Sequence, residues 1–116
     1  PPYGALAGLA LVIWFVLRGV GTILLVPLIE ELFFRGYLET RLRLGTGVLW
    51  TWIAALVTAS LFALLHDRWA EAFAAGLLFS WVKNRNGYVT DAVVSHAIAN
   101  ALIYAVAVLT GNLNII

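Results

Sequence analysis

Cysteine and methionine are both missing from the 116-residue sequence, and charged side chains make up only 11% of it. The lack of cysteine excludes thiol nucleophiles, disulfide bonds and thiolate metal sites, and leaves the redox compartment open. A formal net charge of +1 provides no basic face of the kind that nucleic-acid-binding proteins carry. We therefore expect no DNA or RNA partner. The first residues, Pro1-Pro2-Tyr3-Gly4, contain no initiator methionine and no signal-peptide pattern, so we expect a piece of a longer protein.

Hydrophobic side chains, by contrast, make up 63% of the chain. An ordinary soluble domain is about 45–50% apolar and about 25% charged. The polar side chains are therefore too few to cover a water-facing surface of this size. The composition predicts a multi-pass integral membrane protein in contact with lipid.

Apolar runs and the breaks between them predict an all-α, polytopic membrane helix bundle of about four to five helices. The run over residues 3–17 ends at Arg18 and Gly19 and is expected to be the tail of one spanning helix. A long helix over residues 19–43 should follow, with a kink at Pro27. Thr46 and Thr90 are expected to cap the helices that they precede. The remaining helices are expected over residues 47–66, 69–82 and 91–109.

The basic residues divide between the two ends of these helices. Four of them fall at one set of ends and two at the other, and the positive-inside rule places the larger set in the cytoplasm. The larger set is Arg41, Arg43, Lys83 and Arg85, and the smaller set is Arg18 and Arg68.

Ionisable residues within predicted spans are costly unless they are paired or face a wet cavity, so they are the informative positions. Glu31 and Arg35 are four residues apart on one helix face and should form an ion pair. Glu30 points about 100° away from Glu31 and has no such local partner. The two histidines, His66 and His96, are its natural helpers.

Two further pairs share helix faces at a spacing of four residues: Phe62 with His66, and His96 with Asn100. We expect Glu30 and His66 to activate a water molecule. An imidazole and an amide that point at one place suit a developing oxyanion, and His96 with Asn100 offers this pair.

Each of these residues also has a purely structural interpretation. The Glu31–Arg35 pair is more readily explained as an ion pair that fixes helix orientation, with catalysis by Glu31 secondary. A histidine at a helix end is more often interfacial than catalytic, Asn100 alone could join two helices, and Phe62 alone is a core or lipid-facing aromatic. Only the combination favours a catalytic site.

Other protease chemistries are tested by their motifs. The sequence has no His-Glu-x-x-His zinc helix and no Gly-x-Ser-x-Gly nucleophile turn. Asp67 and Asp91 occur in unrelated contexts at predicted helix ends, which disfavours an aspartyl dyad. A site made of glutamate and histidine stays open for a metal, because both are acceptable zinc ligands.

The three motifs Glu30-Glu31-x-x-x-Arg35, Phe62-x-x-x-His66 and His96-x-x-x-Asn100, in this order, resemble the CPBP family. This family includes CAAX prenyl endopeptidases and bacteriocin-processing or immunity proteins. The resemblance covers residues 20–109 and implies one CPBP-type intramembrane protease domain over residues 1–116.

The resemblance implies a peptide hydrolase that acts on a membrane-associated protein or peptide. In it, Glu30 and His66 activate water, and His96 and Asn100 stabilise the oxyanion. Glu31, Arg35 and Phe62 are supporting residues. No catalytic metal is expected, and if zinc is used its ligands would be Glu30, His66 and His96.

A finer resemblance concerns the segments at residues 64–69 and 109–111, which are similar to bacterial members that accompany exosortase-type sorting systems. They imply a bacterial inner membrane. Two other functions stay open: a non-catalytic immunity or scaffold protein, and a proton-coupled carrier, which the small number of helices disfavours. One geometric difficulty also stands, because straight helices would place His66 and His96 near opposite membrane faces. We expect irregular helix geometry at Pro27 and over residues 69–82 to bring them together.

Overall fold

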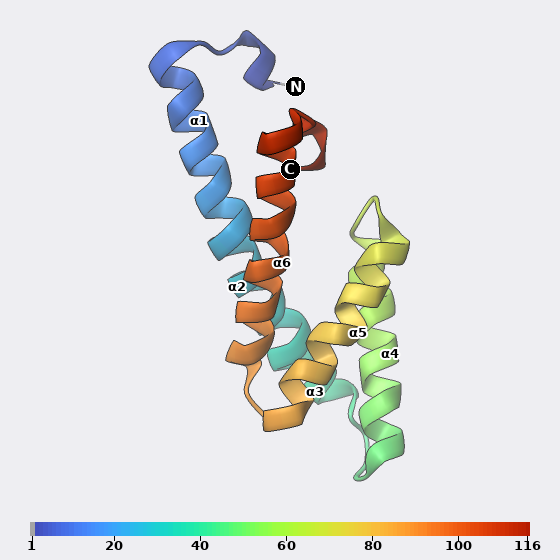
Figure 1. Cartoon of the computed structure of the whole chain (residues 1–116). Coiled ribbons are helices and arrows are strands. Elements are labelled where there is room, and N and C mark those ends of the chain that lie inside the picture. Colours follow the sequence, from blue (N-terminus) through green and yellow to red (C-terminus); the bar gives the residue numbers. More distant parts are fainter. Residues whose placement is uncertain (1) are drawn as a thin grey trace.

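One long helix forms the first part of the chain in the structure, a computed structural model that describes residues 2–116 (Figure 1). After the short helix η1 (Pro2–Ala5), this helix runs without interruption from Gly8 to Leu42. Its successive segments are α1 (Gly8–Val20), η2 (Gly21–Leu25), α2 (Val26–Glu31), η3 (Leu32–Leu38) and α3 (Glu39–Leu42).

The predicted boundary at Arg18 and Gly19 is therefore wrong. Arginine is a good helix former, and one glycine costs only about 1 kcal/mol relative to alanine. In lipid the backbone has no water to bond, so an uninterrupted helix is favoured over a break that exposes its polar groups.

The two segments η2 and η3 are π-helical, and the first of them ends two residues before Pro27. Proline has no N–H, and its ring clashes with the carbonyl four residues earlier. A wider turn relieves this clash. The backbone N–H of Val26 accordingly donates to the oxygen of Gly21, five residues back, and Glu39 N–H donates to Phe34 in the same way. The expected irregularity at Pro27 thus takes the form of a π-helical segment.

Three further helices follow: α4 (Val48–Leu64), α5 (Trp69–Asn86) and α6 (Val89–Thr110), with a short η4 (Leu113–Ile115) after them. The predicted threonine caps are wrong. The N-cap positions are Gly47 and Tyr88, and neither makes a side-chain capping bond. Helices α5 and α6 are capped at their C-termini by Gly87 and Gly111, both in the left-handed conformation that glycine tolerates best.

Helix α5 is a regular α-helix that extends past the predicted end at residue 82. The expected irregularity over residues 69–82 is therefore wrong. Lys83 and Arg85 lie in its last turn, where positive charge interacts favourably with the helix dipole, so these polar residues prolong the helix.

The helices form an elongated bundle of 55 × 23 × 19 Å, which confirms the predicted all-α class. Helix α6 runs antiparallel to the long helix and packs on α2 and η2, while α5 crosses obliquely between α4 and α6 (Figure 1). Small buried residues allow close contact of α4 and α5, and a β-carbon at Gly76 would lie 3.2 Å from Ala59 Cα.

Two of the described helices, Gly8–Leu42 and Val89–Thr110, are long and apolar enough to cross a membrane, and their most apolar 18-residue stretches have mean hydropathies of 2.4 and 2.0. Helix α4 has 17 residues and is expected to be about 25 Å long. The larger set of basic residues gathers at one end of the bundle. There Arg43 Nη2 donates to Asn84 Oδ1 at 3.2 Å, and Lys83 Nζ pairs with Glu39 Oε2 at 3.1 Å.

Candidate active site

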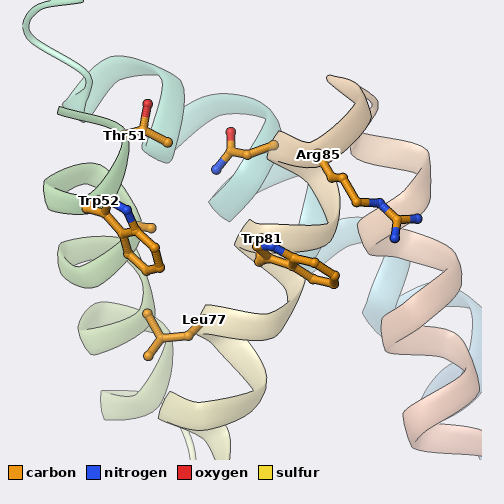
Figure 2. Close-up of a pocket in the computed structure, with 7 residues that line it drawn as sticks. Thr51, Trp52, Leu77, Trp81 and Arg85 are labelled. Atoms are coloured by element: carbon orange, nitrogen blue, oxygen red, sulfur yellow. The ribbon is translucent and has the colours of Figure 1, made fainter. Parts of the chain in front are cut away.

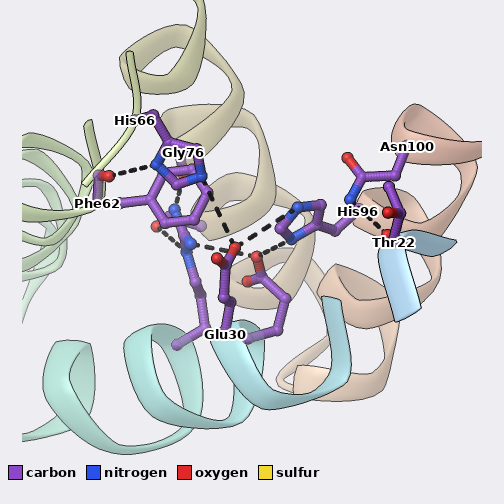
Figure 3. Close-up of polar contacts among 10 residues, drawn as sticks. Thr22, Glu30, Phe62, His66, Gly76, His96 and Asn100 are labelled. Atoms are coloured by element: carbon purple, nitrogen blue, oxygen red, sulfur yellow. Dashed lines mark hydrogen bonds and ion pairs between the residues drawn. The ribbon is translucent and has the colours of Figure 1, made fainter. Parts of the chain in front are cut away.

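Glu30, on α2, occupies the centre of the polar cluster shown in Figure 3. Its Oε2 lies 3.9 Å from His66 Nε2 and 3.8 Å from His96 Nε2. The glutamate side chain is one-quarter exposed, yet its Oε2 is buried and has no hydrogen-bond donor within residues 2–116. One carboxylate oxygen thus faces two imidazole nitrogens that come from different parts of the chain.

His66 lies in the turn just after α4 and not on the helix as predicted. Its ring still contacts Phe62, with 4.3 Å between the ring centres, and its Nδ1 lies 2.7 Å from the Phe62 carbonyl oxygen. A carbonyl only accepts hydrogen bonds, so Nδ1 carries the hydrogen. In the neutral ring, Nε2 therefore presents a lone pair towards Glu30.

His66 and His96 lie close together, as expected, since both reach the same carboxylate oxygen. Helix α4 starts lower than α6 in Figure 1, which brings the end of α4 closer in level to the first turns of α6. If α4 and α6 began at the same level, straight helices would keep the two histidines apart.

His96, on α6, is buried and held on two sides. Its Nδ1 donates to Glu31 Oε1 at 2.7 Å, and its ring stacks on Phe79, with 4.6 Å between the ring centres and 17° between the planes. A carboxylate behind an imidazole fixes the tautomer and the orientation of the ring. Glu31 therefore directs His96 Nε2 towards Glu30.

Arg35, in η3, is fully buried and confirms the predicted pair with Glu31, at 3.2 Å between Nη1 and Oε1. Its Nη2 donates to the Gly76 carbonyl at 2.7 Å, and its Nε donates to Ser80 Oγ at 3.4 Å. The guanidinium carbon also lies 4.8 Å from the centre of the Phe62 ring. Arg35 thus connects the long helix to α5 through the site.

Several of these partners were not predicted from the sequence. Gly76 and Ser80 are four residues apart on α5, which was the available signal that a small and polar face points into the bundle. Phe79 offered no comparable signal, because an aromatic residue within an apolar helix is unremarkable in a membrane protein.

Asn100 shares a face of α6 with His96, as predicted, but its amide engages the backbone of the long helix. Its Nδ2 donates to the Thr22 carbonyl at 2.8 Å. Figure 3 shows Asn100 beside Thr22, beyond His96 as seen from Glu30. Its role as an oxyanion donor stays a prediction.

The charges of the cluster do not balance when both imidazoles are neutral. Glu30 and Glu31 carry two negative charges, and Arg35 carries one positive charge. Burial of a net charge is costly in a bundle surrounded by lipid. One further proton on Glu30, His66 or His96 makes the cluster neutral, and such a proton is chemically useful in amide hydrolysis.

Zinc accepts carboxylate and imidazole ligands, so the cluster has the donor types that a zinc site requires. Within residues 2–116, however, no group of three or more His, Cys, Asp or Glu side chains has an arrangement that could hold a metal ion. The described residues thus include the donor types for a metal without the arrangement that would hold one.

A separate apolar pocket of about 230 Å³ lies between α4 and α5 (Figure 2). Trp52 and Trp81 form part of its walls, and the guanidinium of Arg85 lies 5.3 Å from the centre of the Trp81 ring. None of the residues in the polar cluster lines this pocket. Tryptophan beside arginine is typical of helix ends at a membrane interface.

Comparison with known proteins identifies the family. Residues 12–102 match the family model described as "type II CAAX prenyl endopeptidase Rce1-like", and this span contains all the residues of the polar cluster. No curated protein and no solved structure matched the chain. The match confirms the predicted membership of the CPBP family. Through the family, it also confirms the prediction of a membrane protease. The chain belongs to the Rce1-like family of type II CAAX prenyl endopeptidases.

Proposed function

We propose that this protein hydrolyses a peptide bond of a membrane-associated protein or peptide with a water molecule activated by Glu30 and His66. One observation carries the proposal. The buried Oε2 of Glu30 faces the Nε2 atoms of both histidines at 3.8–3.9 Å and accepts no hydrogen bond from residues 2–116. These separations exceed hydrogen-bond length and suit polar groups that share a bound molecule.

In the proposed reaction, Glu30 removes a proton from water while His66 Nε2 accepts a hydrogen bond from the same water. The water oxygen adds to the peptide carbonyl carbon and forms a tetrahedral intermediate. His96 carries the extra proton of the cluster as an imidazolium paired with Glu31, and its Nε2–H donates to the oxyanion. Glu30 then passes the water proton to the leaving amine as the C–N bond breaks. The hydrogen and hydroxyl of water thus end on the two products.

We propose that this reaction needs no metal ion. Removal of divalent metals from the purified protein by a chelator, followed by dialysis, is expected to leave kcat and KM unchanged. Activity lost to the chelator and restored by zinc would contradict this and would favour Glu30, His66 and His96 as ligands. Metal analysis of the same samples serves as the control.

For the substrate, the family supports a CAAX-type peptide, and we propose that a lipid anchor delivers it to the site. The assay is cleavage, by the protein in liposomes, of two peptides of identical sequence with and without a prenyl group. Cleavage of the prenylated peptide alone supports a lipid-anchored substrate. The similarity of residues 64–69 and 109–111 to bacterial members supports a bacterial inner-membrane location.

His66→Ala is the variant that tests the water-activating pair in this assay. Loss of one member of an acid–base pair typically costs about 10²–10⁴-fold, and we expect a decrease of this size in kcat. Asp67→Ala, an exposed neighbour in the same turn, is the matched control and should retain activity. A His66→Ala variant that cleaves at the normal rate would exclude His66 from the mechanism.

A further inference from the structure

We infer that Asn100 is a positioning residue, which holds Glu30 in place by capping the Thr22 carbonyl, which Pro27 and the π-helical turn leave without a backbone partner. The inference rests on the proposed function of Glu30. It concerns how the site is held in shape, and it gives Asn100 a role that requires no contact with the substrate.

The backbone of η2 explains why Thr22 needs an outside donor. Val26 N–H donates to the oxygen of Gly21, so the hydrogen-bond register at this point joins residues five apart. In this register the next pair joins the Thr22 oxygen to the nitrogen of residue 27. Residue 27 is proline, which has no N–H.

Asn100 supplies the missing donor from α6. Its Nδ2 lies 2.8 Å from the Thr22 oxygen, a good hydrogen-bond length. A carbonyl in a lipid-surrounded bundle cannot form a hydrogen bond with bulk water instead, so the loss of this donor would be costly. The amide therefore stabilises the π-helical turn against a return to the α register.

The register matters because it sets the direction of Glu30. A π-helical turn contains one residue more than an α turn, and each residue of an α-helix advances it by about 100°. A return of η2 to the α register would rotate α2 relative to α1 by roughly this angle. Glu30 and Glu31 would then no longer face His66 and His96.

The hydrogen bond also couples the two elements that carry the site. Asn100 lies one helical turn after His96, and Thr22 lies on the helix that carries Glu30. Tyr104, one turn further along α6, makes a comparable bond to the Phe15 carbonyl at 2.6 Å, in the regular helix α1. Tyr104→Phe is therefore a matched control that removes a similar bond away from the π-helical turn.

The test is a cycle of Asn100→Ala and Pro27→Ala. An alanine at position 27 removes the ring clash and supplies an N–H, so the turn can return to the α register. Pro27→Ala should therefore lower kcat even while Asn100 is present. We expect Asn100→Ala alone to lower kcat by about 10²-fold, the size of effect that a small misplacement of catalytic groups produces, with KM unchanged. In the Pro27→Ala background the same substitution should cost far less. An equal loss in both backgrounds would overturn the inference and favour the oxyanion role.

A spectroscopic measurement reports on the bond without any cleavage. Thr22-Ile23 is the only Thr-Ile step in the sequence, so ¹³C-carbonyl threonine with ¹⁵N isoleucine gives one selective signal for the Thr22 carbonyl in solid-state NMR. Asn100→Ala should shift this signal, the added Pro27→Ala should shift it back, and Tyr104→Phe should leave it in place. A signal unaffected by Asn100→Ala would overturn the inference.

The two proposals can fail independently. The carbonyl shift reports on the register even if the protein hydrolyses nothing. Conversely, normal cleavage by a Glu30 variant would contradict the proposed function but would not affect the inference about the hydrogen bond between Asn100 and Thr22. A poorly folded Asn100→Ala variant is covered by the double variant, in which Val26 N–H can donate to Thr22 in the α register. Its carbonyl signal should recover, and its kcat should stay low.

Discussion

Glu30→Gln should abolish peptide cleavage while the protein stays folded and membrane-inserted. Glutamine has the same shape but cannot take a proton from water, so the general base is lost. We therefore expect kcat to fall by about 10³-fold or more. The neutral side chain removes no hydrogen bond to Oε2 from residues 2–116, because none is present. The melting temperature in detergent should therefore be unchanged or slightly raised.

A matched control is Glu71→Gln, an exposed glutamate at the start of α5 that pairs with Arg68. This variant should cleave at the normal rate. Normal cleavage by Glu30→Gln would show that Glu30 is not the base, and the proposed mechanism would be wrong. Lost cleavage together with a large fall in melting temperature would instead show that Glu30 supports the fold.

Arg35→Met should have the largest effect on stability. The side chain keeps its approximate length, but Glu31 loses its cation and the Gly76 carbonyl loses its donor. Removal of one partner of a buried pair costs about 3–5 kcal/mol, because the other charge stays buried. The unfolding free energy, measured by titration with a denaturing detergent in bicelles, should fall by this amount.

The double variant Glu31→Gln with Arg35→Met removes both charges and should recover part of the lost stability. Arg68→Met is the control, since the Arg68–Glu71 pair is exposed and contributes little. An Arg35→Met variant as stable as the unmodified protein would mean that the ion pair does not hold the bundle together. Activity should fall with stability, because Glu31 also orients His96.

The composition and the spacing of polar residues were sufficient to predict the helical class and the Glu31–Arg35 pair, because both depend on short-range patterns. The position of Glu30 relative to the two histidines could not be derived in this way. It depends on the offset between α4 and α6 and on the oblique course of α5, and these arise from packing between helices. Residue spacing within one helix contains no information about either.

The π-helical segments show a different limit of sequence reasoning. Pro27 indicated a disturbance in the helix, and the predicted kink was the usual consequence. The wider turn is preferred here because α6 offers an amide to the carbonyl that the turn exposes. The conformation of one helix thus depends on a residue 78 positions away. The predicted caps at Thr46 and Thr90 failed for a related reason. Threonine prefers N-cap positions, but this preference does not determine the residue at which a helix begins.

The small size of Gly76 determines both how closely α4 and α5 pack and where the Arg35 guanidinium lies. A β-carbon there would lie 2.9 Å from Arg35 Nη2 as well as against Ala59. Any bulkier residue at position 76 would push α4 and α5 apart and would also displace the Arg35 guanidinium. A substitution at this contact would therefore disturb the polar cluster, although neither Gly76 nor Ala59 carries an ionisable group.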